Sequence, residues 1–194
     1  VSWIFVFEII VLMGIECFTE KDFTSSVTKL SLSTLIIFYP GFLITFISRL
    51  TDVENYSTQY IILFILLVFI CDSLAWFFGV LFGKSTRGYI AVSPNKSLVG
   101  FAGGIVGSIL SGVLMKFLCP NALAGAWWKI FVISIACGLS TIVGDLIESV
   151  FKRSTNVKDS GTLIPGRGGV LDSIDSLLAT APIFYIFLYF LYLA

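Results

Sequence analysis

Long apolar segments constrain this chain more than any other feature of its sequence. A helix needs about 20 mostly apolar residues to cross the hydrocarbon core of a bilayer. Six stretches of this kind lie at about 1–18, 30–47, 60–82, 98–117, 126–147 and 171–194. They are continuous runs and do not alternate between apolar and polar residues, which argues against a closed β-barrel. The sequence therefore predicts an all-α, polytopic bundle of about six transmembrane helices.

Composition agrees with a membrane protein. Hydrophobic residues make up 57% of the chain and charged residues 12%, whereas about 25% charged residues is usual in soluble domains. We expect one membrane-embedded domain over residues 1–194, with N-terminal helices in 1–59 and the candidate catalytic residues in 60–194. The first apolar run starts at Val1 without a basic leader, so further N-terminal helices are expected before it, and not a cleavable signal peptide. The net charge of zero gives no argument for a nucleic-acid partner.

The lack of histidine and the scattered cysteines limit the kinds of active site that this chain can form. The chain has no histidine, which excludes a histidine-based catalytic triad, a histidine-ligated zinc site and a histidine proton shuttle within it. Its four cysteines show no CxxC pairing, and three of them lie inside apolar runs. We interpret them as small apolar packing residues.

Lysine and arginine are distributed unevenly between the connections. With six spans, the connections that share one side carry nine basic residues: Lys21, Lys29, Lys84, Arg87, Lys96, Lys152, Arg153, Lys158 and Arg167. The other side carries Arg49, Lys116 and Lys129. Because basic connections stay in the cytoplasm, the sequence predicts that the nine-residue side is cytoplasmic.

Glycine and proline mark two of the apolar runs. The 98–117 run contains five glycines, mostly at spacings of three and four: Gly100, Gly103, Gly104, Gly107 and Gly112. Small residues at such spacings let helices approach closely in lipid. We expect a packing surface there, and it is also a candidate face for a homodimer. Pro40–Gly41 should kink the second run.

Acidic residues cluster at the margins of two apolar runs. Asp145 and Glu148 are three residues apart, as are Asp172 and Asp175, so each pair shares a helix face. Two acidic clusters at one membrane level would repel unless a cation lay between them, and oxygen ligands suit Mg²⁺. Alternatively, Asp172 caps a helix N-terminus, but capping does not explain Asp145 or Glu148.

One further acid lies within an apolar run. Asp72 is near the middle of the third run, where an ionisable side chain is functional by default. The alternative is a carboxyl group that fixes helix packing through a hydrogen bond. Trp76 and Gly79 follow Asp72 on the same helix face.

The long connection between the last two runs is basic and contains glycine. Lys152, Arg153, Lys158 and Arg167 can neutralise phosphate oxygens, and the small Gly168 and Gly169 let backbone N–H groups approach them. Such a loop can instead bind anionic lipid headgroups or set the topology. The glycines and the flanking acids favour a phosphate site.

Residues 149–175, SVFKRSTNVKDSGTLIPGRGGVLDSID, resemble the signature of the phosphatidate cytidylyltransferases, also called CDP-diacylglycerol synthases. The positions that match are Ser149, Lys152, Arg153, Lys158, Asp159, Gly161, Ile164, Pro165, Gly168, Gly169, Val170, Asp172, Ile174 and Asp175. A second stretch is similar to another family pattern through Asp72, Ala75, Trp76, Gly79, Gly83, Lys84, 93–97 and Gly100. The resemblance covers about 72–194. Arg167, Ser173 and Val99 stand where the family patterns have histidine, arginine and glutamate, which weakens the transfer of details such as nucleotide preference.

The resemblance implies a reaction in phospholipid biosynthesis. CTP and phosphatidic acid would give CDP-diacylglycerol and pyrophosphate, with Mg²⁺ held by Asp145, Asp172 and Asp175 and a second cation left open. Lys152, Arg153, Lys158 and Arg167 would hold the triphosphate. The remaining expected substrate-binding residues are Ser149, Asp159, Gly168, Gly169, Asp72 and Lys96. The resemblance also implies a multi-pass protein of a bacterial inner membrane, with its active site facing the cytoplasm and membrane lipids around it.

Three other kinds of protein compete with this interpretation. One is another membrane phosphate enzyme, such as a CTP-dependent polyprenol or phytol kinase, or a CDP-alcohol phosphotransferase, although the motif of the latter is not found in the sequence. Another is an ion-coupled transporter that uses Asp72 and Asp145 as a relay. The third is an inactive lipid-binding member of the family.

Overall fold

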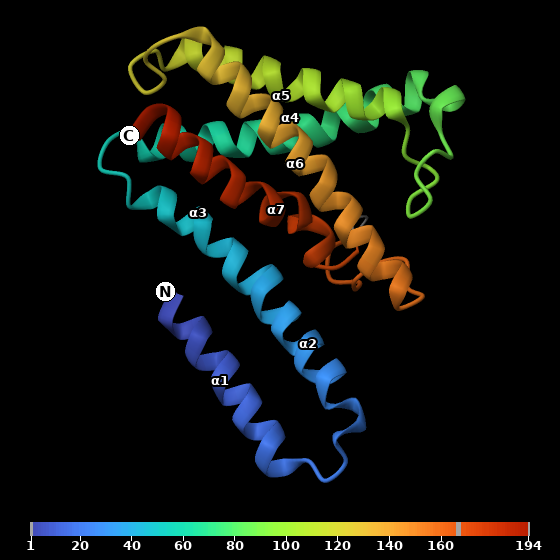
Figure 1. Cartoon of the computed structure of the whole chain (residues 1–194). Coiled ribbons are helices and arrows are strands. Elements are labelled where there is room, and N and C mark those ends of the chain that lie inside the picture. Colours follow the sequence, from blue (N-terminus) through green and yellow to red (C-terminus); the bar gives the residue numbers. More distant parts are fainter. Residues whose placement is uncertain (1, 166–167, 194) are drawn as a thin grey trace.

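The computed structural model describes residues 2–165 and 168–193, and its regular elements are helices. The long ones are α1 (Ser2–Thr19), α2 (Ser26–Ile36), α3 (Leu43–Thr51), α4 (Ser57–Phe82), α5 (Leu98–Leu118), α6 (Trp127–Ser154) and α7 (Leu171–Leu188) (Figure 1). The short ones are η1 (Phe23–Ser25), η2 (Ile37–Phe42), η3 (Lys84–Thr86) and η4 (Tyr189–Leu193). The all-α prediction is confirmed.

Five helical segments among the described residues are long and apolar enough to cross a membrane: Phe23–Thr51, Ser57–Phe82, Leu98–Leu118, Trp127–Ser154 and Leu171–Leu193. This confirms a multi-pass helix bundle. The sequence predicted six spans, and α1, the first of them, is not among the five.

Helix α6 continues past the end of the fifth apolar run. The run ends near Ile147, but the helix ends at Ser154, because Glu148, Lys152 and Arg153 are polar residues that still favour a helix. Lys152 and Arg153, which were expected in the loop, therefore lie on the last turns of α6. Hydropathy had located the apolar part of this helix and not its end.

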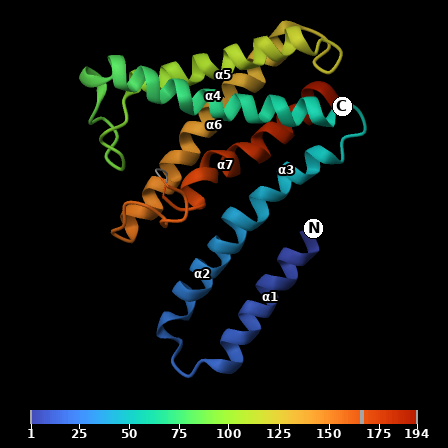
Figure 2. The same cartoon turned by 180° about the vertical axis from the view of Figure 1, so that it is seen from behind.

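The Pro40–Gly41 break lies within η2, a π-helical segment between α2 and α3. Proline lacks a backbone N–H and clashes with the preceding turn of an α-helix, and the wider π-turn accommodates it. Figures 1 and 2 show α2 and α3 following each other along nearly one line, with α1 beside α2. The two elements form a single long helical arm.

Helices α4 and α5 run side by side in opposite directions (Figure 2). A Cβ atom on Gly104 would lie 3.0 Å from the carbonyl oxygen of Cys71, and one on Gly107 would lie 3.0 Å from that of Ile70. An added Cβ atom would be tight against the α4 backbone at both positions, and glycine avoids this contact where the two helices approach each other. The predicted packing surface is confirmed, and it is used within the chain, so a homodimer would need another surface.

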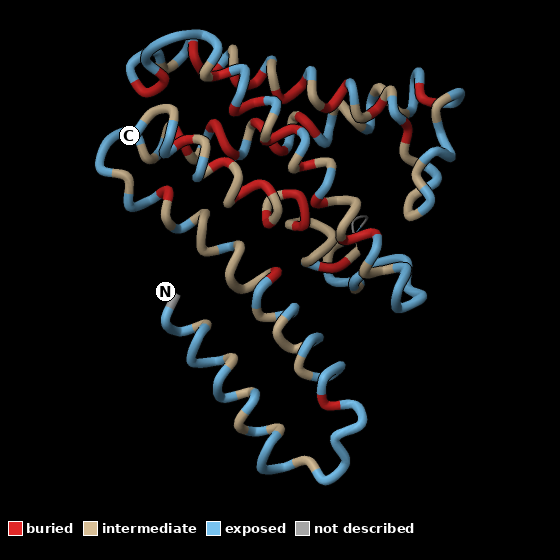
Figure 3. The backbone as a smooth tube through the Cα atoms, viewed as in Figure 1, coloured by how far each residue is buried: buried red, intermediate tan, exposed pale blue. Residues whose placement is uncertain are grey.

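The core lies where α4, α6 and α7 meet. Phe64, Leu67, Ile133, Leu178 and Phe184 are each at most 1% exposed. Figure 3 shows the buried residues concentrated in α4–α7, whereas α1 and α2 extend away from the bundle and are mostly exposed. The core thus fixes α4, α6 and α7, the three helices that carry the acidic residues.

Candidate functional site

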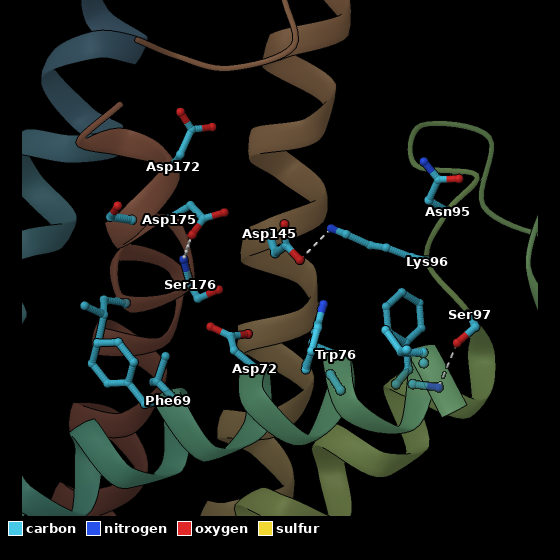
Figure 4. A pocket seen from close by; sticks show the side chains of 18 of the residues that line it. Phe69, Asp72, Trp76, Asn95, Lys96, Ser97, Asp145, Asp172, Asp175 and Ser176 are labelled. Atoms are coloured by element: carbon cyan, nitrogen blue, oxygen red, sulfur yellow. Dashed lines mark hydrogen bonds and ion pairs between the residues drawn. The ribbon is translucent and has the colours of Figure 1, made fainter. Parts of the chain in front are cut away.

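A cavity of about 620 Å³ lies between these helices and the connection from α4 to α5. Helix α4 lines it with Asp72, and the connection lines it with Lys96. Asp145 comes from α6, and Asp172 and Asp175 come from α7. Figure 4 shows these side chains around one space. The structure therefore brings together acids that are up to about 100 residues apart in the sequence.

A close approach of α6 and α7 places Asp145 beside Asp175. A Cβ atom on Gly144 would lie 2.7 Å from Cβ of Ala179 and 3.0 Å from the carbonyl oxygen of Asp175. Real Cβ atoms do not come as close to another carbon as 2.7 Å, so only glycine fits at this crossing. Gly144 thus allows the next residue on α6 to face the acid on α7.

Asp145, Glu148 and Asp175 form an acidic cluster in which one carboxylate oxygen of each lies within 4.8 Å of the others. Glu148 is 1% exposed and Asp175 is 6% exposed. Buried carboxylates so close together repel each other, and their loss of hydration is costly unless a cation compensates.

The cluster fits a divalent cation. Oε1 of Glu148 is buried and has no hydrogen-bond partner among the described residues, so a ligand oxygen is available. Two oxygens bound to one Mg²⁺ at about 2.1 Å are at most about 4.2 Å apart, and small side-chain rotations would bring the cluster into that range. Carboxylate oxygens are the ligands that Mg²⁺ prefers.

A basic residue from the α4–α5 connection completes this part of the site. Nζ of Lys96 lies 2.5 Å from Oδ2 of Asp145, and both side chains line the cavity. Asp72 reaches into the same space from α4 (Figure 4). The cavity wall on α4 also carries Trp76, which is 71% exposed, and Phe69. The α4 side of the cavity therefore combines Asp72 with apolar side chains, one of which faces outward, and α6, α7 and the α4–α5 connection supply the other charged side chains.

Asp172 anchors the loop that precedes α7. Its Oδ2 accepts hydrogen bonds from the backbone N–H and hydroxyl of Ser160, at 2.7 and 2.6 Å, and from the Gly169 N–H at 2.7 Å. Its Oδ1 accepts one from Nζ of Lys152 at 2.7 Å. Asp172 therefore holds the loop against the start of α7. The acidic cluster contains Glu148, whereas the sequence had predicted Asp172 as its third member.

Lys152 joins the two groups of acids. Its Nζ lies 2.5 Å from Glu148 and 2.7 Å from Asp172. The side chain was expected to hold phosphate, and in the structure it pairs with two carboxylates within the protein. A buried carboxylate with a lysine partner is far less costly than an unpaired one, so Lys152 stabilises both acids.

Three of the other residues expected to bind phosphate form hydrogen bonds within the protein. The backbone N–H of Gly168 bonds to the Ile164 carbonyl at 3.0 Å, and the Gly169 N–H bonds to Asp172, so both N–H groups expected to approach phosphate have partners within the loop. The Ser149 hydroxyl donates to the Asp145 carbonyl at 2.9 Å.

Three of the basic and acidic residues remain accessible at the surface. Arg153 is exposed, and its Nε lies 3.5 Å from the Val92 carbonyl. Lys158 and Asp159 are also exposed. Arg167 lies outside the described residues. The exposed side chains of Arg153, Lys158 and Asp159 can therefore meet a ligand at the surface.

Two residues of the site were not among the predicted ligands. Glu148 was seen on the face of Asp145, and its spacing of three residues was the signal that could have assigned it. Arg87 lines the cavity, and its Nη2 donates to the Gly79 carbonyl at 3.0 Å. No pattern in the sequence marked Arg87 apart from its charge.

Comparison with known proteins gives a consistent result. A family model described as "Cytidylyltransferase family" matches residues 1–191. The chain is 39% identical over 161 residues to a protein of Haemophilus influenzae named phosphatidate cytidylyltransferase, covering 81% of this chain and 55% of that protein. It is 32% identical over 187 residues to a protein of the same name from Bacillus subtilis, covering 95% of this chain and 65% of that protein. The chain spans about half the length of the first relatives that it matches.

Proposed function

Because the chain belongs to the cytidylyltransferase family, we propose that it carries the active site of a phosphatidate cytidylyltransferase of phospholipid biosynthesis. The observation that carries the proposal is the cavity in which Asp72, Lys96, Asp145 and Asp175 converge beside apolar side chains of α4. The charged side chains suit a nucleotide triphosphate, and the apolar side chains suit the acyl chains of a lipid.

The proposed reaction joins the phosphate of phosphatidic acid to the α-phosphorus of CTP. A phosphate oxygen of the lipid forms the new P–O bond, and the bond between the α- and β-phosphates breaks and releases pyrophosphate. The attacking oxygen is already anionic at neutral pH, so the reaction does not need a histidine base. The chain must neutralise the triphosphate and align two anions.

Different residues are proposed to bind the cation and the phosphate groups, according to where they lie in the site. Asp145 and Asp175, together with Glu148, would hold Mg²⁺, which when bound neutralises phosphate charge and orients the leaving group. Lys96 lies against Asp145 at the cavity wall, where its ammonium group can also meet a phosphate oxygen. Arg153, Lys158 and Arg167 are proposed to meet the triphosphate from the aqueous side.

The roles of Asp172 and Lys152 in the proposal are to hold the loop and the acidic cluster in place. Through its bonds to Ser160 and Gly169, Asp172 ties these two loop residues to the first turn of α7. Direct contact between Asp172 and the cation stays a prediction, since the side chain also lines the cavity.

We further propose that the cavity opens toward the cytoplasm of a bacterial inner membrane. The basis is the bias of nine basic residues against three. A lipid headgroup would enter from the side of the membrane, and CTP would arrive from the cytosol.

The function is tested with the purified full-length protein in detergent micelles. Phosphatidic acid, labelled CTP and Mg²⁺ are expected to give a labelled lipid and pyrophosphate in equal amounts, and leaving out any one of them should stop the reaction. If the folded protein forms no lipid-linked CDP, the proposal fails. A labelled lipid that carries only one phosphate from the γ-position would identify a kinase instead.

A further inference from the structure

Tyr39 lies outside every motif considered so far, in the π-helical segment η2 of the N-terminal arm. It is 7% exposed. Its ring packs edge-on against Phe151 of α6, with the ring centroids 5.3 Å apart. Phe151 is three residues after Glu148 and so shares its helix face. Tyr39 of the arm therefore lies beside the part of α6 that carries Glu148.

Two buried polar atoms at this place lack hydrogen-bond partners among the described residues: the Tyr39 hydroxyl and Oε1 of Glu148. One is able to donate a proton and the other only to accept one. A buried hydroxyl and a buried carboxylate oxygen are each unfavourable when they lack a hydrogen-bond partner, so this place suits a further polar species such as a bound water.

We infer that Tyr39 is a positioning residue for the divalent cation, whose hydroxyl hydrogen-bonds to a water ligand of the ion beside the acidic cluster. This inference rests on the proposed metal site. Mg²⁺ keeps several of its waters when it binds to proteins, and groups that hold those waters tune its affinity. A phenol suits this position because its oxygen can accept a hydrogen bond from a water that is bound to the ion.

The geometry of the arm supports the assignment. A π-turn carries an extra residue in its ring of hydrogen bonds and is frequent at functional sites. Segment η2 and helix α3 both pack against α7, the helix that carries Asp175. The arm is thereby held against the site on two helices, and Tyr39 is the residue of η2 that is buried there.

The test measures cation binding directly, without nucleotide or lipid. Mn²⁺ bound to the purified full-length protein is determined by electron paramagnetic resonance for the unchanged protein and for Tyr39→Phe, which keeps the ring and its packing on Phe151. Removing an outer partner of a bound metal weakens affinity by about 10- to 100-fold, so Tyr39→Phe should raise the dissociation constant at least about tenfold. A dissociation constant within about twofold of the unchanged protein overturns the inference.

Tyr60→Phe is the matched control. Tyr60 is also buried, and its hydroxyl donates to the Ala122 carbonyl at 2.9 Å near the start of α4. This variant loses a buried hydrogen bond far from the cluster, so its unfolding temperature should fall while Mn²⁺ affinity stays the same. Equal weakening of Mn²⁺ binding in both variants would mean a general structural effect and would contradict the assignment.

The outcomes separate this inference from the proposed function. If the unchanged protein and Tyr39→Phe bind Mn²⁺ with the same affinity, only the role of Tyr39 is contradicted. An unchanged protein that binds no Mn²⁺ contradicts both the metal site and this role. In the double variant Tyr39→Phe with Glu148→Gln, the dissociation constant for Mn²⁺ should rise by less than the product of the two single increases, because the two residues act on one ion. An increase equal to the full product would count against a shared site.

Discussion

Nζ of Lys96, at the end of the α4–α5 connection, lies 2.5 Å from Oδ2 of Asp145 on α6. The contact ties a basic connection to the acidic cluster and fixes the side chain of Asp145 where it faces Asp175. The position of a proposed metal ligand thus depends on a residue nearly 50 places earlier in the chain.

Replacing Lys96 by methionine should lower turnover more than it lowers stability. Charged hydrogen bonds contribute roughly 1.5–3 kcal/mol, so kcat/KM for CTP should fall about 10- to 100-fold. Lys84→Met, at an exposed lysine of the same connection, is the control and should keep its activity. Equal kinetics in the two variants would remove Lys96 from the site.

Replacing Asp172 by asparagine should release the loop before α7. The variant loses the charge that Lys152 meets and weakens the bonds from Ser160 and Gly169, so turnover should be lost while the helix bundle stays folded. Trypsin should cut the released loop faster, and this rate is the measurement. Lys158→Gln in the same background should slow the cutting, which shows that the loop is the site of cleavage. An unchanged cutting rate in Asp172→Asn would contradict the anchoring role.

Replacing Gly144 by alanine should separate α6 from α7. The new methyl group would meet Ala179 at 2.7 Å, and overpacking of this kind costs about 1–3 kcal/mol. We expect a lower unfolding temperature and a loss of activity, because Asp145 moves away from Asp175. Gly14→Ala is the control, since nothing lies within 4 Å of its added Cβ. Full activity in Gly144→Ala would show that the acids need not be so close.

Labelling of single cysteines should reveal the orientation. In a background with Cys17→Ser and Cys119→Ser, Thr155→Cys should react with an impermeant reagent only when the cytoplasmic side is open to it. Asn121→Cys, in the connection between α5 and α6, should react from the other side. Both positions are exposed. The reverse pattern would contradict the proposed cytoplasmic active site.

The sequence predicted the helices well where hydrophobicity decides the structure. The runs at 60–82, 98–117 and 171–194 agree closely with α4, α5 and α7 with η4, because a membrane span must satisfy its backbone within one helix. It predicted the end of α6 poorly, since the polar residues 148–154 continue the helix outside the apolar run.

The candidate site shows a similar division. The spacing of the acids indicated a shared cation, and the structure brings Asp145 and Asp175 together with Glu148. Which of the four acids cluster depends on how α6 and α7 cross, and periodicity within one helix cannot give this. Tyr39 left no signal at all, because a tyrosine in an apolar run resembles a packing residue until its neighbours in space are known.

Turnover by Asp175→Asn is the most direct test of whether the acidic cluster supports nucleotidyl transfer. The variant keeps the size of the side chain and removes the charge that the cation needs. Formation of CDP-diacylglycerol from CTP and phosphatidic acid should fall at least about 1000-fold, equivalent to roughly 4 kcal/mol of transition-state stabilisation, in a protein that still elutes as a folded species. Asp52→Asn, at an exposed acid after α3, should retain full activity. A folded Asp175→Asn protein with the same turnover as Asp52→Asn would contradict the account.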